Sequence, residues 1–296
     1  MQVVSGFEDT KPFEVLQPAQ QSTPFVFNSP HSGRHYPLAF LQASRLDALA
    51  IRRSEDAFVD ELFSGVVELG APLLCARFPR AYLDVNREPY ELDPKMYEDR
   101  LPPYANSRSI RVAGGLGTIA RVVGEAQEIY RTRLTVREAL DRIETIYKPY
   151  HQTLRRLLAR THVAFGHAVL IDCHSMPSTI RSSDNGPRPD FILGDRYGTS
   201  CARSVIDQAT DILRGMGYTV ARNKPYAGGF ITEHYGRPAK GLHALQVEIN
   251  RSLYMDEPRT DRSSGFAELS RDMRRFCEEL VAGSDADLAP DALAAE

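Results

Sequence analysis

The sequence lacks the features that mark several specialised classes of protein. Its 296 residues contain four scattered cysteines and no C-x-x-C pair, which argues against a disulfide framework or a cysteine zinc site. No apolar run has the length of a membrane span, and the first residues lack the basic-then-apolar layout of a signal peptide. We therefore expect a cytoplasmic protein without a membrane partner.

An excess of charge of one sign is also missing. The net charge is −3 and the pI is about 6.3, so nothing indicates a nucleic-acid partner. The hydrophobic fraction of 42% and the charged fraction of 25% are ordinary for a globular protein. We expect a single catalytic domain over residues 1–281 and a disordered tail over residues 282–296, and nothing in the composition specifies an oligomeric state.

Apolar, β-branched runs alternate along the chain with longer amphipathic segments. Strands are predicted at residues 24–28, 72–78, 81–85, 168–175, 190–195, 218–223 and 242–250. Helices are predicted at residues 55–70, 135–162, 199–217 and 265–280. The pattern predicts an α/β fold, with a mostly parallel or mixed central sheet and helices on both faces. Thr135 is expected to cap the second helix, and Pro149 to kink or divide it.

Polar side chains follow several of these predicted strands. In open α/β sheets, ligands bind beyond the carboxyl ends of the strands, so this placement selects candidates for a functional site. The candidates are His31, Asn86, Arg87, His174, Asp195 and Glu248.

His31 and His174 are the candidates for binding a metal. His31 lies shortly after the predicted strand 24–28, and His174 follows the apolar part of the predicted strand 168–175; each is followed by serine. A hydrolytic zinc site commonly combines two histidines with one carboxylate, and Asp56 or its neighbour Glu55 could supply the carboxylate. The alternatives are that the histidines are hydrogen-bonded loop residues and that the acids favour a helix N-terminus. Asp172 could orient a ligand imidazole.

Further polar residues suit a substrate or a reaction. Asn86 and Arg87, directly after the predicted strand 81–85, offer an amide and a planar fork of donors for a carboxylate. Arg80, directly before that strand, alternates with Asn86 along the segment, and a surface salt bridge is the alternative for one arginine. Glu248 lies inside an apolar strand and could act as a general base, or could pair with Arg251.

Two glycine-rich stretches are expected to be loops. The stretch 225–238, "PYAGGFITEHYGRP", is predicted to be a flexible loop over the substrate and contributes Thr232 as a binding candidate. "AGGLGT", residues 113–118, is too short for a phosphate loop and is predicted to be a turn. No G-x-S-x-G motif is present, which disfavours a serine nucleophile.

Several motifs together resemble the N-formylglutamate amidohydrolase family. They run in family order from about Val26 to the last predicted helix, and they are "NSPHSG", "SEDAFVDEL", "DVNRE", "IDCHSMPS", "GDRYG", "GGFITEHYGRP" and "LQVEINRSLYMD". That family is similar to the zinc carboxypeptidases and aspartoacylases. The resemblance implies a zinc carboxypeptidase-like, phosphorylase/hydrolase-like fold and hydrolysis of N-formyl-L-glutamate to formate and L-glutamate in histidine degradation.

The resemblance also implies roles for individual residues. It implies one zinc ion on His31, His174 and an acid from "SED", with Glu248 as the base, and a substrate carboxylate on Asn86 and Arg87. The chain departs from the carboxypeptidase pattern at Arg34, where that pattern has a glutamate ligand, so the acidic ligand must come from elsewhere. The role of His35 stays open.

Alternatives remain for the metal and for the activity. Another divalent metal is compatible with these ligands. Another zinc-dependent N-acyl-amino-acid amidohydrolase or a carboxypeptidase-like enzyme would share the site. A non-enzymatic metal- or amino-acid-binding protein would not need Glu248 as a base.

Overall fold

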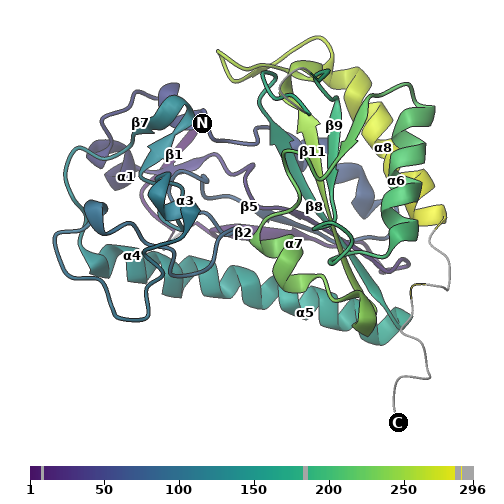
Figure 1. The fold of residues 1–296 in the computed structure, drawn as a ribbon, viewed down its shortest axis with the longest axis horizontal. Helices are drawn as coiled ribbons and strands as arrows, with labels where there is room; N and C mark the ends of the chain where they lie inside the picture. The colour runs from purple at the N-terminus through teal and green to yellow at the C-terminus, as the bar shows by residue number, and fades with distance from the viewer. Residues whose placement is uncertain (8–9, 183–185, 284–287, 289–296) are drawn as a thin grey trace. The chain divides into compact units, whose positions relative to one another are not determined.

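The structure is a computed structural model that describes residues 1–7, 10–182, 186–283 and 288. Among these residues, seven strands form one sheet in the order β10-β9-β11-β8-β3-β5-β2 (Figure 1). The strands are β2 Phe13–Leu16, β3 Phe25–Ser29, β5 Leu73–Ala76, β8 Ala168–Met176, β9 Phe191–Gly194, β10 Val220–Arg222 and β11 Leu242–Asn250. The pairs β3–β8, β8–β11 and β9–β10 are parallel and β9–β11 is antiparallel, so the predicted α/β class with a mixed sheet is confirmed.

Residue contacts divide the chain into two compact units. One unit contains residues 1–14, 30–57 and 75–153, and the other contains residues 15–29, 58–74 and 154–296. Both are assembled from separate segments of the chain. The single domain over residues 1–281 stays a prediction, and the predicted tail at 282–296 lies almost entirely outside the described residues.

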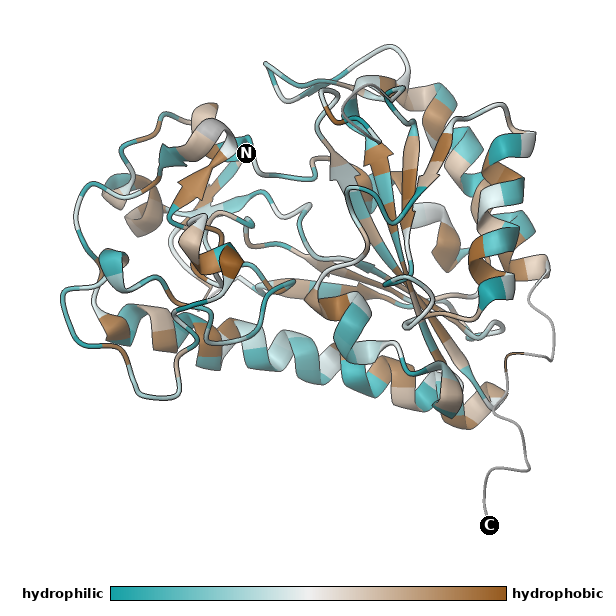
Figure 2. Ribbon diagram, in the orientation of Figure 1, coloured by the Kyte–Doolittle hydropathy of each residue, from teal (hydrophilic) through white to brown (hydrophobic). Residues whose placement is uncertain are grey.

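The second unit contains the most buried strands. All nine residues of β8 are buried, as are eight of the nine in β11, because both strands have neighbours on either side in the sheet. Helix α7 (Phe230–Tyr235) packs on β8 and β11, and α2 (Val59–Leu62) packs on β8 and on α8 (Phe266–Ala282). Helix α6 (Arg203–Gly215) packs on α8. Figure 2 shows β8, β9 and β11 mainly in the hydrophobic colour, while α6 and α8 carry hydrophilic stripes.

The first unit consists mainly of short elements and long connections. Strands β1 (Gln2–Val4) and β4 (His35–Pro37) pair in parallel, and β6 (Val122–Val123) pairs with β7 (Gln127–Glu128). The helices are α1 Leu38–Ala43, α3 Ile110–Ala113, α4 Val136–Arg142 and the start of α5 Lys148–Phe165. Between α4 and α5 lies a π-helical turn at Ile143–Tyr147.

Three predicted segments differ from the structure. Residues 81–85 form no strand, since the backbone turns back so that Tyr82 N donates to Pro79 O over 2.9 Å. The predicted helix 55–70 is reduced to α2 and a 3₁₀ turn at Ser64–Val67, because Phe58 takes a left-handed backbone conformation with φ of 66°. The expected flexible loop 225–238 contains α7, whose Ile231 and Thr232 are fully buried.

The predicted helix at residues 135–162 agrees with the structure more closely than the three segments above. It consists of α4, the π-helical turn and most of α5. Thr135 is the N-cap of α4 and forms a capping box with Glu138, as predicted. The π-helical turn ends directly before Lys148 and Pro149, which places the break one turn ahead of the proline. No helix in the described ranges combines the length and hydropathy needed to cross a membrane, and the four cysteines are free and buried.

Candidate metal centre and active site

His31 lies in the turn that follows β3, where the chain passes close to another backbone segment. A Cβ atom on Gly33 would lie 1.9 Å from the carbonyl oxygen of Phe78, so only glycine fits at this position. The backbone N–H of Asp56 donates to the carbonyl of His31 over 3.0 Å, which ties the start of the next segment to this turn. Glycine at 33 therefore matters for close packing of the turn that carries His31.

Two carboxylates contact the His31 ring from opposite sides. Nε2 lies 2.8 Å from Asp84 Oδ1, and Nδ1 lies 3.3 Å from Asp56 Oδ2. All three side chains are buried. A histidine whose Nε2 is held by a carboxylate presents Nδ1 in a fixed direction, which is the usual arrangement for a metal ligand.

The structure separates the two acids that the sequence left as alternatives. Glu55 accepts a hydrogen bond from the Tyr36 hydroxyl over 2.6 Å and pairs with Arg52 at 3.0 Å. Burial, followed by Glu55, raises the pKa of Tyr36 well above its usual value, so the tyrosine stays a donor. Because Glu55 is taken up by this pair, Asp56 is the acid that faces His31.

Asp84 contacts His31 and was not among the residues that the sequence selected. Burial alone would raise its pKa, but the charges of Arg87, Arg80 and His31 hold the pKa of Asp84 well below its usual range. Arg80 Nε donates to Asp84 Oδ2 over 3.0 Å, and the backbone N–H of Asn86 donates to Oδ1 over 2.8 Å. Asp84 is therefore a charged carboxylate that fixes His31 from within "DVNR".

The predicted substrate-binding residues are largely occupied with protein contacts in this segment. Arg87 donates from Nε to Leu116 O and from Nη1 to Asn86 O, both over 2.8 Å, and its Nη2 lies 3.6 Å from Asp84. Burial lowers the pKa of Arg87 to about 10, which leaves it charged at neutral pH. Leu116 belongs to the predicted turn 113–118, so that turn supports Arg87.

The π-helical turn supports the same segment from a helix. The Tyr147 hydroxyl donates to Arg87 O over 2.6 Å, and His151 Nε2 lies 2.9 Å from Val85 O. The two rings lie 4.3 Å apart between centroids. His151 is buried and supports this segment through that hydrogen bond. The wider π-helical turn is a feature that functional sites often retain.

Changing Tyr147 to phenylalanine should destabilise the protein by about 1–2 kcal/mol, because it removes a buried donor and leaves the Arg87 carbonyl without that bond. Urea unfolding measures the change. Tyr104→Phe, at a side chain that is 59% exposed, is the matched control and should change stability little. Equal stability of both variants would show that the Tyr147 bond contributes nothing.

The second unit builds a row of polar side chains across three neighbouring strands. Asn28, Asp172 and Gln246 are register partners on β3, β8 and β11, and two residues further along His174 is the partner of Glu248. Since these positions differ by two along each strand, all five side chains lie on one face of the sheet. The expected convergence of His174 and Glu248 therefore follows from strand register.

Within this row, hydrogen bonds fix each functional group. Asn28 Nδ2 donates to Asp172 Oδ1 over 2.8 Å, and Asp172 Oδ2 lies 2.9 Å from His174 Nε2. Asp172 thus orients His174 as Asp84 orients His31. This geometry agrees with the role that the sequence suggested for Asp172.

Glu248 is held by a neighbour that the sequence reasoning did not single out. Gln246 Nε2 donates to Glu248 Oε1 over 2.8 Å, and the side-chain carbonyl oxygen of Gln246, Oε1, accepts from the backbone N–H of Gly229 over 2.8 Å. The Thr232 hydroxyl donates weakly to the same carbonyl over 3.5 Å and is fully buried. Thr232 therefore contacts Gln246. Gln246 could have been identified from the sequence, because it lies two residues before Glu248 and alternation in a strand places both side chains on one face.

His31, Asp56 and His174 form a group of possible metal ligands. One ligand atom from each lies within 4.8 Å of the others, and all three residues are buried. The 3.3 Å between His31 Nδ1 and Asp56 Oδ2 is also about the 3.3 Å that separates two ligands of a tetrahedral zinc with bonds near 2.0 Å. Two imidazoles and a carboxylate are a donor set that zinc accepts, so these residues fit the metal.

Other polar residues lie elsewhere. Asp195 accepts from Asn223 over 2.7 Å, which ties β9 to the end of β10. His35 belongs to β4, where its backbone N–H donates to Arg77 O, and burial followed by the Arg34 charge lowers its pKa. His243 accepts from the backbone of Ala202. None of these three is in the His31 group.

Comparisons with known proteins show which proteins this chain resembles. The family model of N-formylglutamate amidohydrolase matches residues 23–255. The N-formylglutamate deformylases of Pseudomonas putida and Pseudomonas aeruginosa are 31% and 29% identical over 82% of this chain and 86% of theirs. The crystal structure of N-formylglutamate amidohydrolase from Ralstonia eutropha superposes with a TM-score of 0.87 at 37% identity, covering 92% of this chain and 97% of that one.

Proposed function

We propose that this chain, which belongs to the N-formylglutamate amidohydrolase family, hydrolyses N-formyl-L-glutamate to formate and L-glutamate. The observation that carries the proposal is the pair of imidazoles, each anchored by an acid, together with Asp56 and the buried Glu248. Two histidines, an aspartate and a glutamate are the residue types that metal-assisted hydrolysis of an amide requires.

We further propose that His31, Asp56 and His174 bind one zinc ion, with another divalent metal as the alternative. When bound, zinc would supply a Lewis acid that polarises the formyl oxygen and acidifies a water molecule. Asp84 and Asp172 would hold each imidazole with its Nδ1 toward the metal, since their carboxylates occupy both Nε2 atoms.

Glu248 is the proposed general base. Its carboxylate would take a proton from the attacking water while the water oxygen bonds to the formyl carbon. Glu248 would then pass that proton to the amide nitrogen as the C–N bond breaks, which releases formate and the free amine of glutamate. Gln246 supports this role because its amide fixes one carboxylate oxygen of Glu248 over 2.8 Å.

Arg80, Asn86 and Arg87 are the proposed binding residues for a substrate carboxylate. Arg80 uses Nε for Asp84 and is 26% exposed, whereas the Arg87 side chain is 11% exposed and bonded to two carbonyls. We therefore assign the direct contact mainly to Arg80 and a supporting position to Arg87. Thr232 would act through Gln246, with which its hydroxyl forms a hydrogen bond.

Metal removal should abolish the reaction and zinc should restore it. The purified protein is stripped with a chelator, and formate release from N-formyl-L-glutamate is followed with and without added zinc. We expect loss of at least about a hundredfold in turnover for the metal-free protein, because the Lewis acid is gone. Full turnover after complete removal, checked by metal analysis, would rule out the zinc proposal.

The same assay also tests the choice of substrate. N-acetyl-L-glutamate and N-formyl-L-aspartate vary the acyl group and the amino acid separately, and the proposal expects N-formyl-L-glutamate to have the highest kcat/KM. A preference for either analogue would place the chain with another N-acyl-amino-acid amidohydrolase. The proposed pathway is histidine degradation, and the proposed location is the cytoplasm. The four free cysteines support the location, because thiols stay reduced there.

A further inference from the structure

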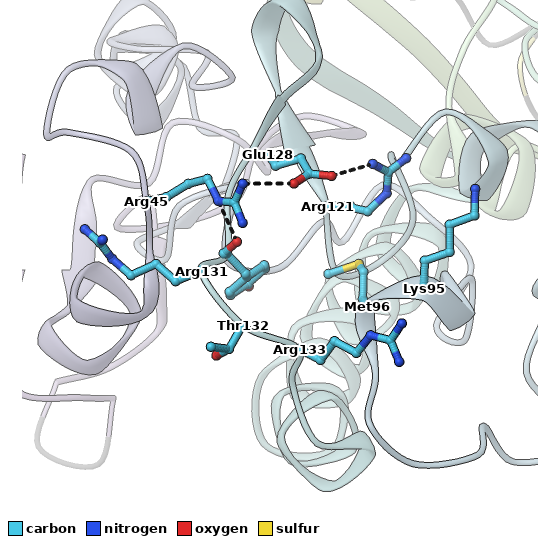
Figure 3. Close-up of a pocket in the computed structure, with 9 residues that line it drawn as sticks. Arg45, Lys95, Met96, Arg121, Glu128, Arg131, Thr132 and Arg133 are labelled. Carbon is cyan, nitrogen blue, oxygen red and sulfur yellow. Dashed lines mark hydrogen bonds and ion pairs between the residues drawn. The ribbon is translucent and has the colours of Figure 1, made fainter.

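Among the described residues, five cationic side chains and one carboxylate line a pocket in the first unit. It has a volume of about 160 Å³, and the charged residues that line it are Arg45, Lys95, Arg121, Arg131, Arg133 and Glu128 (Figure 3). The whole chain carries a net charge of −3, so this concentration of positive charge is local. None of these residues belongs to the proposed active site.

Glu128, whose side chain is half exposed, supplies a negative charge at this pocket. It lies between Arg45 and Arg121, at 3.2 Å from Arg45 Nη1 and 3.4 Å from Arg121 Nη1 (Figure 3). Arg121 also pairs with Asp93 at 2.8 Å. The guanidinium groups of Arg45 and Arg121 are therefore already held at a spacing that accepts the two oxygens of one carboxylate.

The remaining cations have no acid to compensate them. Within the described part of the chain, Lys95 and Arg133 form no side-chain hydrogen bond or ion pair, and Arg131 donates only to the carbonyl of Ser44 over 2.8 Å. Figure 3 shows Lys95 and Arg133 on the side of the pocket where Arg121 lies. Like charges held this close repel each other, and a bound anion would relieve that repulsion.

We propose that this pocket binds a compact oxyanion with two or more negative charges, of the phosphate or diphosphate type. Guanidinium forks donate paired hydrogen bonds to such oxygens, and an ammonium group adds a point charge. The pocket is too small and too isolated for a nucleic acid, which needs a long basic surface. Met96 and Tyr130 form the buried apolar part of its wall.

The site is connected to the proposed active site through a single loop. Arg121 follows the turn that contains Leu116 and Thr118, whose carbonyls accept from Arg87 Nε and from the backbone of Asp84, both over 2.8 Å. An anion held by Arg121 is therefore bound to the same loop that supports both residues.

Isothermal titration of the full chain with inorganic phosphate, pyrophosphate and ADP tests the proposal. We expect pyrophosphate to bind, and the double variant Lys95→Gln/Arg133→Gln to lower its affinity by at least about tenfold, since two charge-assisted contacts are lost. The control Lys11→Gln/Arg271→Gln removes one lysine and one arginine that are exposed and outside the pocket, and it should bind as the original chain does. If ADP binds with the same affinity as pyrophosphate, the site recognises a free diphosphate. If ADP binds more tightly than pyrophosphate, the site recognises a nucleotide.

Glu128→Gln gives a test that does not depend on the double variant folding. Removing the carboxylate charge of Glu128 from the lining should strengthen pyrophosphate binding several-fold, which general destabilisation would not do. Added sodium chloride should weaken binding in both proteins. The proposal is overturned if the original chain shows no binding at millimolar pyrophosphate, if both double variants bind equally, or if Glu128→Gln binds more weakly.

Discussion

Replacing Glu248 by glutamine is expected to lower kcat for formate release by about 10²- to 10⁴-fold while the protein keeps its metal. The substitution removes the basic carboxylate and little else, because glutamine has the same shape and its carbonyl can still accept from Gln246 Nε2. The strand should also stay in register, since the position is buried within β11. Turnover and metal content, measured on the same sample, separate the chemical step from metal binding.

Glu233→Gln is the matched control for this prediction. Glu233 lies on α7, is 58% exposed and pairs with Arg196, so its loss should leave turnover close to that of the original chain. If Glu248→Gln retained most of its turnover with full metal content, the base would have to be another group. A parallel loss of metal would instead show that Glu248 helps to hold the ion.

The buried strands could be predicted from the sequence because local pattern and final environment agree. The runs 168–175 and 242–250 are apolar with polar residues at alternate or terminal positions, and they became β8 and β11, which have neighbours on both sides. Placing His174 and Glu248 in one row then required only that these two strands pair in parallel. Sites built on regular strands can therefore be predicted from the alternation of apolar and polar residues.

The other half of the site depends on contacts that no local pattern specifies. "AYLDV" has the composition of a strand, yet it forms a buried turn held by Thr118 and His151, which lie 30 or more residues away. Tyr147 holds Arg87, two residues further on. In a strand, the direction of the Asp84 side chain would follow from alternation alone. The predicted strand therefore gave no reason to expect a contact between Asp84 and His31. Likewise, Glu55 and Asp56 differ only in which one Tyr36 and Arg52 engage. Tertiary contacts determine these arrangements, so they could not be predicted from neighbouring residues in the sequence.

Asp84→Ala should have the largest effect on stability among the changes considered. It leaves the guanidinium groups of Arg80 and Arg87 without their buried acid, and breaking a buried ion pair in this way costs about 3–5 kcal/mol. The full charge of Asp84 is present at neutral pH, since its pKa lies well below the usual range. Urea unfolding of the metal-free protein measures the loss without a contribution from metal binding.

Metal affinity distinguishes a positioning role of Asp84 from a purely structural one. Asp84→Asn keeps the shape and an acceptor for His31 Nε2 but removes the charge, and zinc should bind it about 10–100 times more weakly. Asp141→Ala, at an exposed acid that pairs with Arg137 at 3.7 Å, is the control and should change neither quantity noticeably. Unchanged zinc affinity in a folded Asp84→Asn protein would contradict the positioning role. A weakened affinity with His31 still in place would show that this carboxylate sets the direction in which the imidazole faces the metal.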